Sequence, residues 1–299
     1  MKYLIIVLIA VSFYSCKNEN EKQQVNTEQP AIISNKNAQP FEGVMPFDTI
    51  HATNDAELKK TKSVVIKRQS LIDKKDDKAE LDELVIHKTF MKDEDLYLID
   101  FKYPYLNEKM KESYHNFNEY LEETYMDIEG VEASILEDKE MLCDTLRINR
   151  FKEKRLVDYK IYNLNNHLIS VLFYKENYYS GTLHPSYSFD CLNFDLRRSV
   201  FMNYEDFFNE GSEEEMTKTL NEVLSEKINS GDIYYDCWEI SFDDFFEHKN
   251  NFVVDDMKVE YYFDDCVICP SYTGTFSIEI PLERLLPVLK KYKLNPLIQ

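Results

Sequence analysis

The sequence predicts an α+β fold, an antiparallel sheet of hairpins with helices packed on one of its faces, arranged in two subdomains. Short runs with apolar residues at alternate positions, typical of half-buried strands, are joined in pairs by polar turns. Two longer stretches instead repeat apolar residues every three or four positions, as amphipathic helices do. With 299 residues, the chain is long enough to bury a sizeable core.

The first part of this fold is expected to contain two strands and a helix. The strands are predicted over residues 84–90 and 96–103, and Pro104 is expected to end the second because proline cannot donate a ladder hydrogen bond. Asn107 is expected to cap a helix that continues to about residue 125, and a second helical piece is predicted over 131–142. The buried stripe of the first helix is expected to consist of Met110, Tyr114, Phe117, Tyr120, Leu121 and Tyr125.

A hairpin is predicted in the middle of the chain, over residues 156–164 and 167–174. Its second strand is apolar on both faces except at Ser170, which predicts a central place in the sheet. Gly181 then permits a tight turn that other residues resist, and a further strand is predicted over 187–196.

A second long helix is predicted in the last third of the chain. Ser212 and Glu215 have the spacing of a capping box, and Gly231 is expected to end the helix just after residue 229. Its buried stripe is expected to be Met216, Leu220, Val223, Leu224 and Ile228. A short apolar anchor is expected behind the helix, formed by Phe242, Phe245 and Phe246.

The final elements are predicted to be a hairpin over 252–254 and 257–263, a strand over 276–280 and a helix that starts at Pro281. Alternation in the hairpin predicts one buried and one solvent-facing set of side chains. The buried set is expected to be Met257, Val259, Tyr261 and Phe263, and the solvent-facing set Lys258, Glu260 and Tyr262.

The first 60 residues are expected to lie outside the fold. Residues 1–15 contain Lys2 followed by an apolar run that is shorter than the ~20 residues needed to span a bilayer. This pattern predicts a secretory signal peptide. Cys16 follows Ser15 directly and resembles the lipid-bearing cysteine of bacterial lipoproteins; an ordinary signal peptide with an incidental cysteine is the alternative. Residues 16–60 are expected to be a flexible tether. We therefore expect the protein in the bacterial cell envelope, at the outer membrane or facing the periplasm, lipid-anchored at Cys16.

The formal net charge of −20 restricts the classes of partner. Such a field repels phosphate backbones, so no nucleic acid is expected to bind. It favours basic ligands and basic proteins, although solubility alone also accounts for a high negative charge. Besides the membrane that holds the lipid, the partner that the charge favours is therefore a basic protein.

The cysteines carry the sharpest local motif, in which Cys266 and Cys269 are separated by two residues. This spacing occurs in redox dithiols, in metal sites and in disulfides, and buried free thiols are a further alternative. The pair does not lie at the start of a predicted helix, and Cys143, Cys191 and Cys237 are single. We expect a structural disulfide among Cys237, Cys266 and Cys269, with no metal site and no cofactor.

Candidate contact residues cluster in the turn around Gly181. They are the tyrosines on either side of the turn and the histidine within it, for which core packing and turn bracing are the alternatives. This set consists of Tyr178, Tyr179, Gly181, His184 and Tyr187. No catalytic residue can be assigned, although the carboxylate pairs Asp243-Asp244 and Asp264-Asp265 have the chemistry of an acid and a base or of a cation site, with a solvated surface as the simpler reading.

Several short motifs resemble the C-terminal extracellular domain of the anti-sigma factor RsiV, a domain type that also accompanies the peptidoglycan deacetylase PdaC. They are Tyr162-Asn163, Leu168-Ile169-Ser170-Val171, Tyr179-Ser180-Gly181, His184-Pro185, Asn193-Phe194-Asp195-Leu196 and Asp206-Phe207-Phe208, followed by a second match at Tyr262-Phe263, Ile268, Pro270 and Gly274. This resemblance covers about residues 157–289, and residues 84–125 resemble more loosely the companion PdaC-like N-terminal domain. The domains it implies are a PdaC-like N-terminal domain over 61–150 and an RsiV-like C-terminal domain over 151–299.

The resemblance implies a binding domain of the cell envelope, because RsiV-like proteins recognise lysozyme, a basic protein. The sequence departs from the family in showing neither a cytoplasmic segment with a membrane-spanning helix nor a polysaccharide-deacetylase domain. We therefore expect a lipid-anchored envelope protein that recognises a lysozyme-like protein or peptidoglycan, more as a binding protein than as an enzyme. The alternatives are a cell-wall hydrolase or deacetylase-related enzyme with an unidentified carboxylate site, and a structural lipoprotein.

Overall fold

The structure, a computed structural model, describes residues 81–141, 152–180, 182, 185–270 and 273–298. The chain divides into two compact units, residues 1–48 and 49–299, and all described residues belong to the second. The signal peptide, Cys16 and the tether lie outside the described residues and stay predictions. Helices and strands occur in comparable amounts, which confirms the α+β class.

A six-stranded sheet forms the larger layer, with its strands in the order β1-β2-β3-β4-β5-β6. Every neighbouring pair is antiparallel except β2 and β3, which run parallel because the helices between them carry the chain back across the sheet. β4 is central, as expected, and its first seven residues are buried. The strands are β1 (Val85–Asp93), β2 (Tyr97–Leu106), β3 (Glu153–Leu164), β4 (Leu168–Tyr178), β5 (Ser186–Asp195) and β6 (Val200–Met202).

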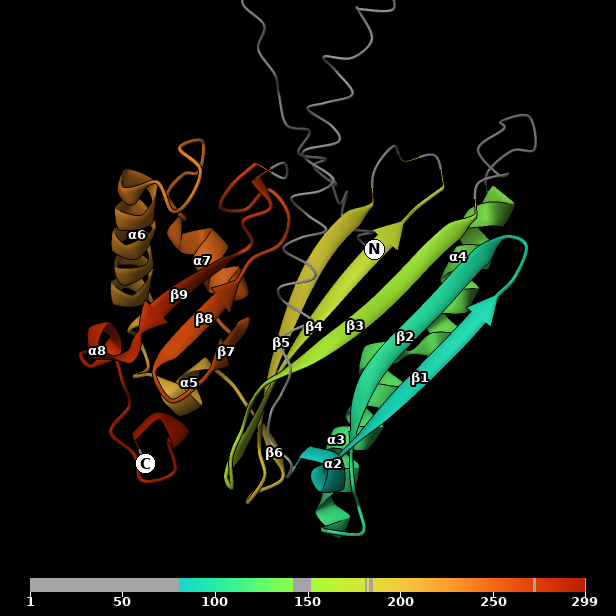
Figure 1. The fold of residues 1–299 in the computed structure, drawn as a ribbon, viewed down its shortest axis with the longest axis horizontal. Coiled ribbons are helices and arrows are strands. Elements are labelled where there is room, and N and C mark those ends of the chain that lie inside the picture. Colours follow the sequence, from blue (N-terminus) through green and yellow to red (C-terminus); the bar gives the residue numbers. More distant parts are fainter. Residues whose placement is uncertain (1–80, 142–151, 181, 183–184, 271–272, 299) are drawn as a thin grey trace, which may run out of the picture. The chain divides into compact units, whose positions relative to one another are not determined.

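Helical segments cover one face of this sheet (Figure 1). After the short α2 (Leu81–Leu84), they follow one another as η1 (Glu112–Tyr114), α3 (His115–Glu119), η2 (Tyr120–Met126) and α4 (Ile128–Met141). Phe117 and Leu121 are completely buried against Phe173 and Phe194 of the sheet. This layer contains the hydrophobic core that the three- and four-residue periodicity predicts.

A second sheet of three antiparallel strands has helices on one face and the first sheet on the other. Its strands are β7 (Phe252–Val254), β8 (Lys258–Tyr262) and β9 (Ser277–Pro281). The helices beside it are α5 (Tyr204–Phe207), α6 (Glu213–Ser230), α7 (Phe242–His248) and α8 (Leu282–Leu285), followed by η5 (Pro296–Ile298). In Figure 1, α6 lies on the outer side of β8 and β9.

Burial of both faces of the second sheet overturns part of the predicted alternation. Tyr262 and Glu260 are buried rather than solvent-facing, because they meet the six-stranded sheet. Glu260 accepts hydrogen bonds from the hydroxyls of Tyr162 and Ser277, both at 2.6 Å. Met257, expected to be buried, is 77% exposed in the turn before β8.

Pro104 lies within β2, opposite His87 of β1, so the prediction that it ends the strand is wrong. The N–H of Leu106, two residues on and on the same side of the strand, donates to the Asn118 side chain at 2.8 Å and not to β1. The nitrogen of Pro104 therefore faces away from β1, on the side where pairing with β3 has already ended at Phe101. No ladder hydrogen bond is lost there, which is why proline is accepted.

The start of the first helical segment also differs from the prediction. The side chain of Asn107 accepts a hydrogen bond from the Lys109 N–H at 3.1 Å, so it closes a turn instead of capping a helix, and helical structure begins at Glu112. Met110 consequently precedes the helix and is exposed. The rest of the predicted stripe faces the core: Tyr114, Phe117 and Leu121 are buried, and Tyr120 and Tyr125 are partly buried.

The long helix α6 agrees with its predicted length and buried stripe but not with its predicted cap. The Ser212 hydroxyl hydrogen-bonds the Asn209 carbonyl at 2.6 Å and the Tyr204 hydroxyl at 2.8 Å, so it does not cap α6. Gly231 ends the helix with φ of 81°, the left-handed conformation that glycine adopts readily. Of the expected phenylalanine anchor, only Phe245 is buried, whereas Phe242 and Phe246 are exposed.

Candidate functional site

The tyrosines predicted as ligand contacts lie in two different surroundings. Tyr179, just after β4, is 41% exposed, and the Arg155 guanidinium lies over its ring at 4.0 Å. Tyr178 ends β4. Tyr187 is partly buried between the sheets, with its ring 5.9 Å from that of Tyr174 and 6.4 Å from that of Phe276. Gly181 and His184 lie outside the described residues, so the predicted constellation stays a prediction.

A buried group of charged side chains lies next to the end of β4. Glu153 is 2% exposed and makes ion pairs with Arg155 at 2.8 Å and with Lys139 at 3.7 Å. The Ser180 N–H also donates to Glu153, at 3.3 Å. These charges satisfy one another inside the protein, so we assign them to holding the chain at Ser180, just after β4.

The cysteines separate into a bonded pair and two others among the described residues. Cys237 and Cys269 form a disulfide, which joins the segment after α6 to the loop between β8 and β9. Cys266 is exposed and lies outside this bond. Cys191 is buried in β5, where burial raises the pKa of its thiol well above the usual value. No group of three or more metal-ligating side chains occurs in the part of the chain that the structure describes.

The two candidate carboxylate pairs have different environments. Asp243 and Asp244 lie in the first turn of α7, where the Ser241 hydroxyl accepts a hydrogen bond from the Asp244 N–H at 3.1 Å and caps the helix. Asp264 lines a cavity of about 390 Å³ together with His248 and Asp190. Desolvation by the surrounding protein raises the pKa of Asp264.

Asp190, on the wall of the same cavity, is already engaged. Its carboxylate accepts a hydrogen bond from the Tyr125 hydroxyl at 2.7 Å and pairs with Lys175 at 2.6 Å. The Lys175 ammonium in turn lies 4.2 Å from the centre of the Tyr125 ring. The arrangement joins η2 to the six-stranded sheet, and we assign no catalytic step to it.

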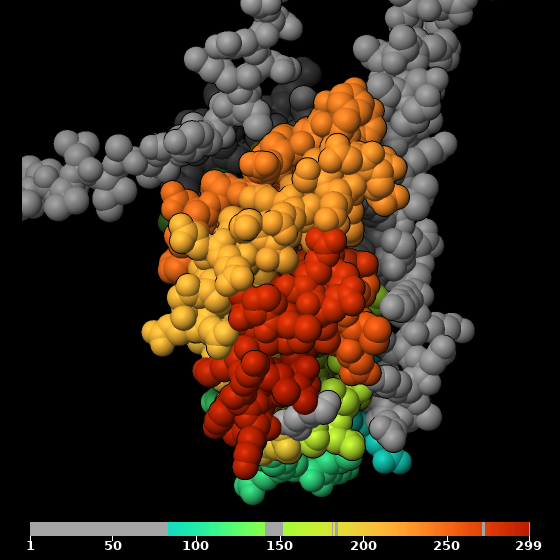
Figure 2. Space-filling model, turned by 90° about the vertical axis from the view of Figure 1, so that its left-hand side faces the viewer, coloured from blue at the N-terminus to red at the C-terminus, as the bar shows by residue number. Residues whose placement is uncertain are grey.

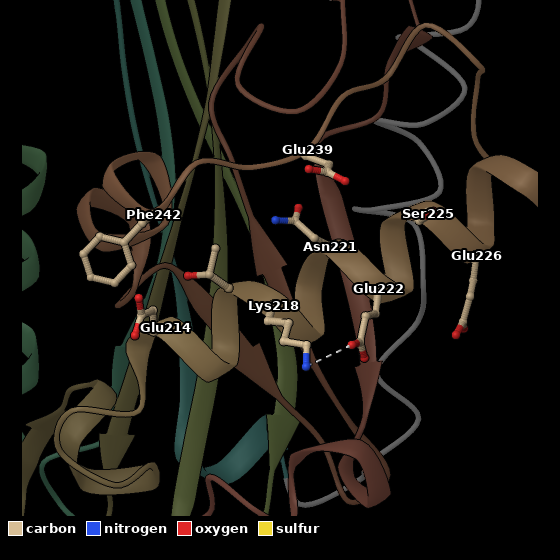
Figure 3. A pocket seen from close by; sticks show the side chains of 9 residues that line it. Glu214, Lys218, Asn221, Glu222, Ser225, Glu226, Glu239 and Phe242 are labelled. Carbon is tan, nitrogen blue, oxygen red and sulfur yellow. Dashed lines mark ion pairs between the residues drawn. The ribbon is translucent and has the colours of Figure 1, made fainter.

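A larger groove of about 620 Å³ runs along the exposed side of α6 (Figure 3). Four glutamates line it against a single lysine, Lys218, whose ammonium lies 3.8 Å from Glu222. Phe242 of α7 closes one end beside Glu214, and Glu239 faces α6 from the opposite wall (Figure 3). The other glutamate is Glu226, which makes a two-pronged ion pair with Arg284 at 2.7 and 2.9 Å.

The helical period explains why this groove is acidic and polar. Glu214, Lys218, Asn221 and Ser225 recur at three- and four-residue steps on the side of α6 away from its buried stripe. The Asn221 side chain donates to the Ile240 carbonyl at 2.9 Å and accepts from the Ile240 N–H at 2.8 Å. This reciprocal pair fixes the second wall of the groove to α6.

The second wall belongs to residues 232–247, which we call the aromatic–acidic segment. It contains six Asp or Glu residues and no Lys or Arg. Five of its aromatic side chains are substantially exposed: Tyr234, Tyr235, Trp238, Phe242 and Phe246. This surface was not predicted from the sequence; the available signal was a run of aromatic residues that alternates with acids and fits neither helical nor strand periodicity.

Hydrogen bonds hold the aromatic–acidic segment in place although residues 232–241 lack regular secondary structure. The Trp238 backbone N–H donates to the Ile268 carbonyl at 3.1 Å, and its indole N–H donates to the Val267 carbonyl at 2.8 Å. The neighbouring Cys237–Cys269 disulfide joins the same two segments covalently. Figure 2 shows this side of the molecule, where α6 and the segment after it form the orange upper part.

No helix among the described residues has the length and apolar character needed to cross a membrane. This finding concerns only residues 81–298 apart from the gaps given above.

Residues 205–283 match a family described as "Protein of unknown function (DUF3298)". The chain is similar to a DUF3298 family protein from Pseudomonas aeruginosa PAO1, with a TM-score of 0.50 and 12% identity over 69% of this chain and 93% of that one. It also matches a member of the same family from Bacteroides fragilis NCTC 9343, with a TM-score of 0.47 and 17% identity over 72% and 96% of the two chains. No curated protein matches.

The likeness to the Pseudomonas protein shows the fold. The family match includes α6, the aromatic–acidic segment and the second sheet, so the groove lies within the matched residues. The finer resemblance to RsiV and PdaC, and the domain boundary at residue 150, stay predictions.

Proposed function

We propose that the chain, which has a DUF3298-type region with an acidic groove on its surface, is a lipid-anchored binding protein of the bacterial cell envelope. Its partner is a basic protein of the lysozyme type, bound by the folded part while the lipid on Cys16 holds the chain at the membrane. Peptidoglycan itself is the other ligand to be tested. The proposal is one of recognition and includes no catalytic step.

The α6 groove carries the proposal. Carboxylates that face the same groove, with one lysine among them, create a local negative potential in addition to the net charge of −20. Such a potential attracts basic proteins and speeds their association, and it repels polyanions. Because these charges are near the surface, their effect is screened over about 8–10 Å at ordinary salt concentrations. Binding is therefore expected to weaken steeply as salt rises.

Binding of lysozyme tests the recognition part of the proposal. We expect the detergent-solubilised full chain to bind immobilised lysozyme at low salt and to lose affinity as the salt concentration is raised. Replacing Glu214, Glu222 and Glu239 together by glutamine is expected to weaken binding about tenfold, or about 1.4 kcal/mol, because each removed charge contributes a few tenths of a kcal/mol at an exposed site.

A matched triple variant separates the groove from the net charge. Glu94, Glu123 and Glu129 are exposed and lie outside the groove, and changing them to glutamine removes the same three charges. Their variant is expected to bind like the wild type. Equal losses in the two triple variants would mean that overall charge and not the groove attracts the partner, and absence of lysozyme binding at low salt would refute the proposed function.

Membrane retention tests the anchoring part. Two or three acyl chains hold a protein stably, since each buried CH₂ contributes ~0.8 kcal/mol. We expect Cys16→Ala to move the protein from the membrane fraction to the soluble fraction of lysed cells. Cys266→Ala, which removes an exposed cysteine elsewhere, is the control and is expected to stay with the membrane. A Cys16→Ala variant that sediments with membranes as completely as the wild type would rule out the anchor.

A further inference from the structure

We propose that the aromatic–acidic segment is the surface on which the basic partner docks, with its exposed rings as anchors for arginine and lysine side chains. This inference rests on the proposed function and goes beyond it, because it assigns the contact surface and its chemistry. The acidic groove attracts the partner, and the rings beside it hold the partner in place.

Exposure of the rings is the first observation. Tyr235 is 74% exposed, Phe246 49%, and Trp238 and Phe242 44% each. Single exposed apolar side chains are ordinary on protein surfaces, but four large rings within twelve residues are a feature of interaction sites. Tryptophan and tyrosine are also the residue types that contribute most binding energy at protein interfaces.

The second observation is that the rings are held ready for contact. Trp238 is fixed by both of its N–H groups, the Cys237–Cys269 disulfide lies next to it, and Ile240 is fixed to Asn221. The Tyr235 ring stacks on its neighbour Tyr234 with 4.9 Å between centroids. A surface that is already ordered loses little conformational entropy on binding, so more of the contact energy appears as affinity.

Charge identifies the class of partner. Six carboxylates and no cationic side chain occur in the segment. Glu239 and Asp243 lie within a few residues of Trp238 and Phe242, so carboxylates accompany the rings along the segment. A guanidinium or ammonium group gains both from the carboxylates and from the face of an aromatic ring. The combination selects a basic protein over acidic peptides and nucleic acids.

The same kind of recognition occurs within the protein, at the end of this segment. The Lys249 ammonium lies 4.5 Å from the centre of the Phe246 ring and pairs with Glu205 at 2.6 Å and Glu213 at 3.1 Å. The hydrogen bond that Lys249 donates to the Glu205 carboxylate raises the pKa of Lys249, so the ammonium is charged at neutral pH. A ring with nearby carboxylates therefore already holds a cation on this surface, and the anchors we assign to the partner are Tyr235, Trp238 and Phe242.

The experiment compares the rates at which variants of the full chain, kept in detergent, dissociate from immobilised lysozyme. We expect each of three variants to bind at least about tenfold more weakly, mainly through faster dissociation: Tyr235→Ala, Trp238→Ala and the double variant Tyr235→Ala/Phe242→Ala. Tyr292→Ala removes a tyrosine that is 51% exposed outside the segment and is expected to bind like the wild type. Because Tyr235 is 74% exposed and, among the described residues, its side chain donates no hydrogen bond that fixes the segment as Trp238 does, Tyr235→Ala keeps the test valid if Trp238→Ala fails to fold.

Each result has a distinct meaning. Weaker binding by the segment variants, with Tyr292→Ala unchanged, supports the inference. Undiminished binding by every segment variant overturns it and leaves the proposed function standing. Failure of the wild-type chain to bind lysozyme at low salt overturns the proposed function and this inference together. Salt-independent binding of peptidoglycan fragments in place of lysozyme, lost in Trp238→Ala, would make the surface a glycan site and overturn the assignment to a basic protein.

Discussion

Replacing Cys237 and Cys269 together by serine is expected to lower the free energy of unfolding by about 3–4 kcal/mol. The disulfide links residues 32 positions apart, and a cross-link of that loop length restricts the unfolded chain by roughly this amount. Cys269 is also almost completely buried, so a serine hydroxyl there would lose its hydrogen bonds to water without gaining a hydrogen-bond partner placed for it in the protein. Urea unfolding followed by circular dichroism measures the change.

Two controls identify the cause of the loss. Cys266→Ser changes a neighbouring exposed cysteine outside the bond and is expected to shift stability by less than about 0.5 kcal/mol. Adding a reductant should destabilise the wild type but not the double serine variant. If the double variant unfolded at the same urea concentration as the wild type, the disulfide would have no role in stability, and the fixed position of the aromatic–acidic segment would have to come from its hydrogen bonds alone.

Phe252→Ala is expected to lower the free energy of unfolding by about 3–5 kcal/mol, since it removes a large buried ring and leaves a cavity. Phe252 lies in β7 and is completely buried. Its ring centroid is 5.3 Å from that of Phe207, 5.6 Å from that of Phe208 and 5.1 Å from that of Tyr261. The substitution therefore weakens contacts to α5 and to β8 at the same time.

Phe242→Ala is the matched control, because it deletes the same side chain from an exposed position. Its effect on stability is expected to stay within about 1 kcal/mol, while Phe252→Ala lowers the melting temperature by several degrees. Thermal unfolding of the two variants side by side provides the measurement. Equal stabilities would mean that Phe252 does not support the core of the second sheet.

Much of the local structure followed from periodicity. The hairpin of β3 and β4, the central place of β4, the buried stripe of α6 and its end at Gly231 all agree with the sequence analysis. Each depends on neighbours in the chain: alternation identifies a strand, three- and four-residue steps identify a helix, and glycine permits the left-handed turn. Such signals are local, so they can be recognised without knowing the rest of the fold.

The cysteines show where local signals were insufficient. The spacing of Cys266 and Cys269 drew attention to that loop, but it left open which cysteine joins Cys237. In the structure Cys269 is buried and bonded, whereas Cys266, three residues away, points to the surface. That choice depends on how the loop between β8 and β9 lies against the segment after α6, which are separated by about 30 residues in sequence.

By itself, then, the sequence determined the α+β class, most strands and helices, and the acidic character of the chain. Tertiary structure alone decided that β2 and β3 pair in parallel, that the six-stranded sheet unites strands from both sides of residue 150, and that Tyr262 is buried. It also decided that five rings of residues 232–247 stay exposed while Phe245 is buried. The physical reason is that the apolar pattern along a helix or strand shows that one of its faces must be buried. What covers its other face comes from segments that are distant in the chain.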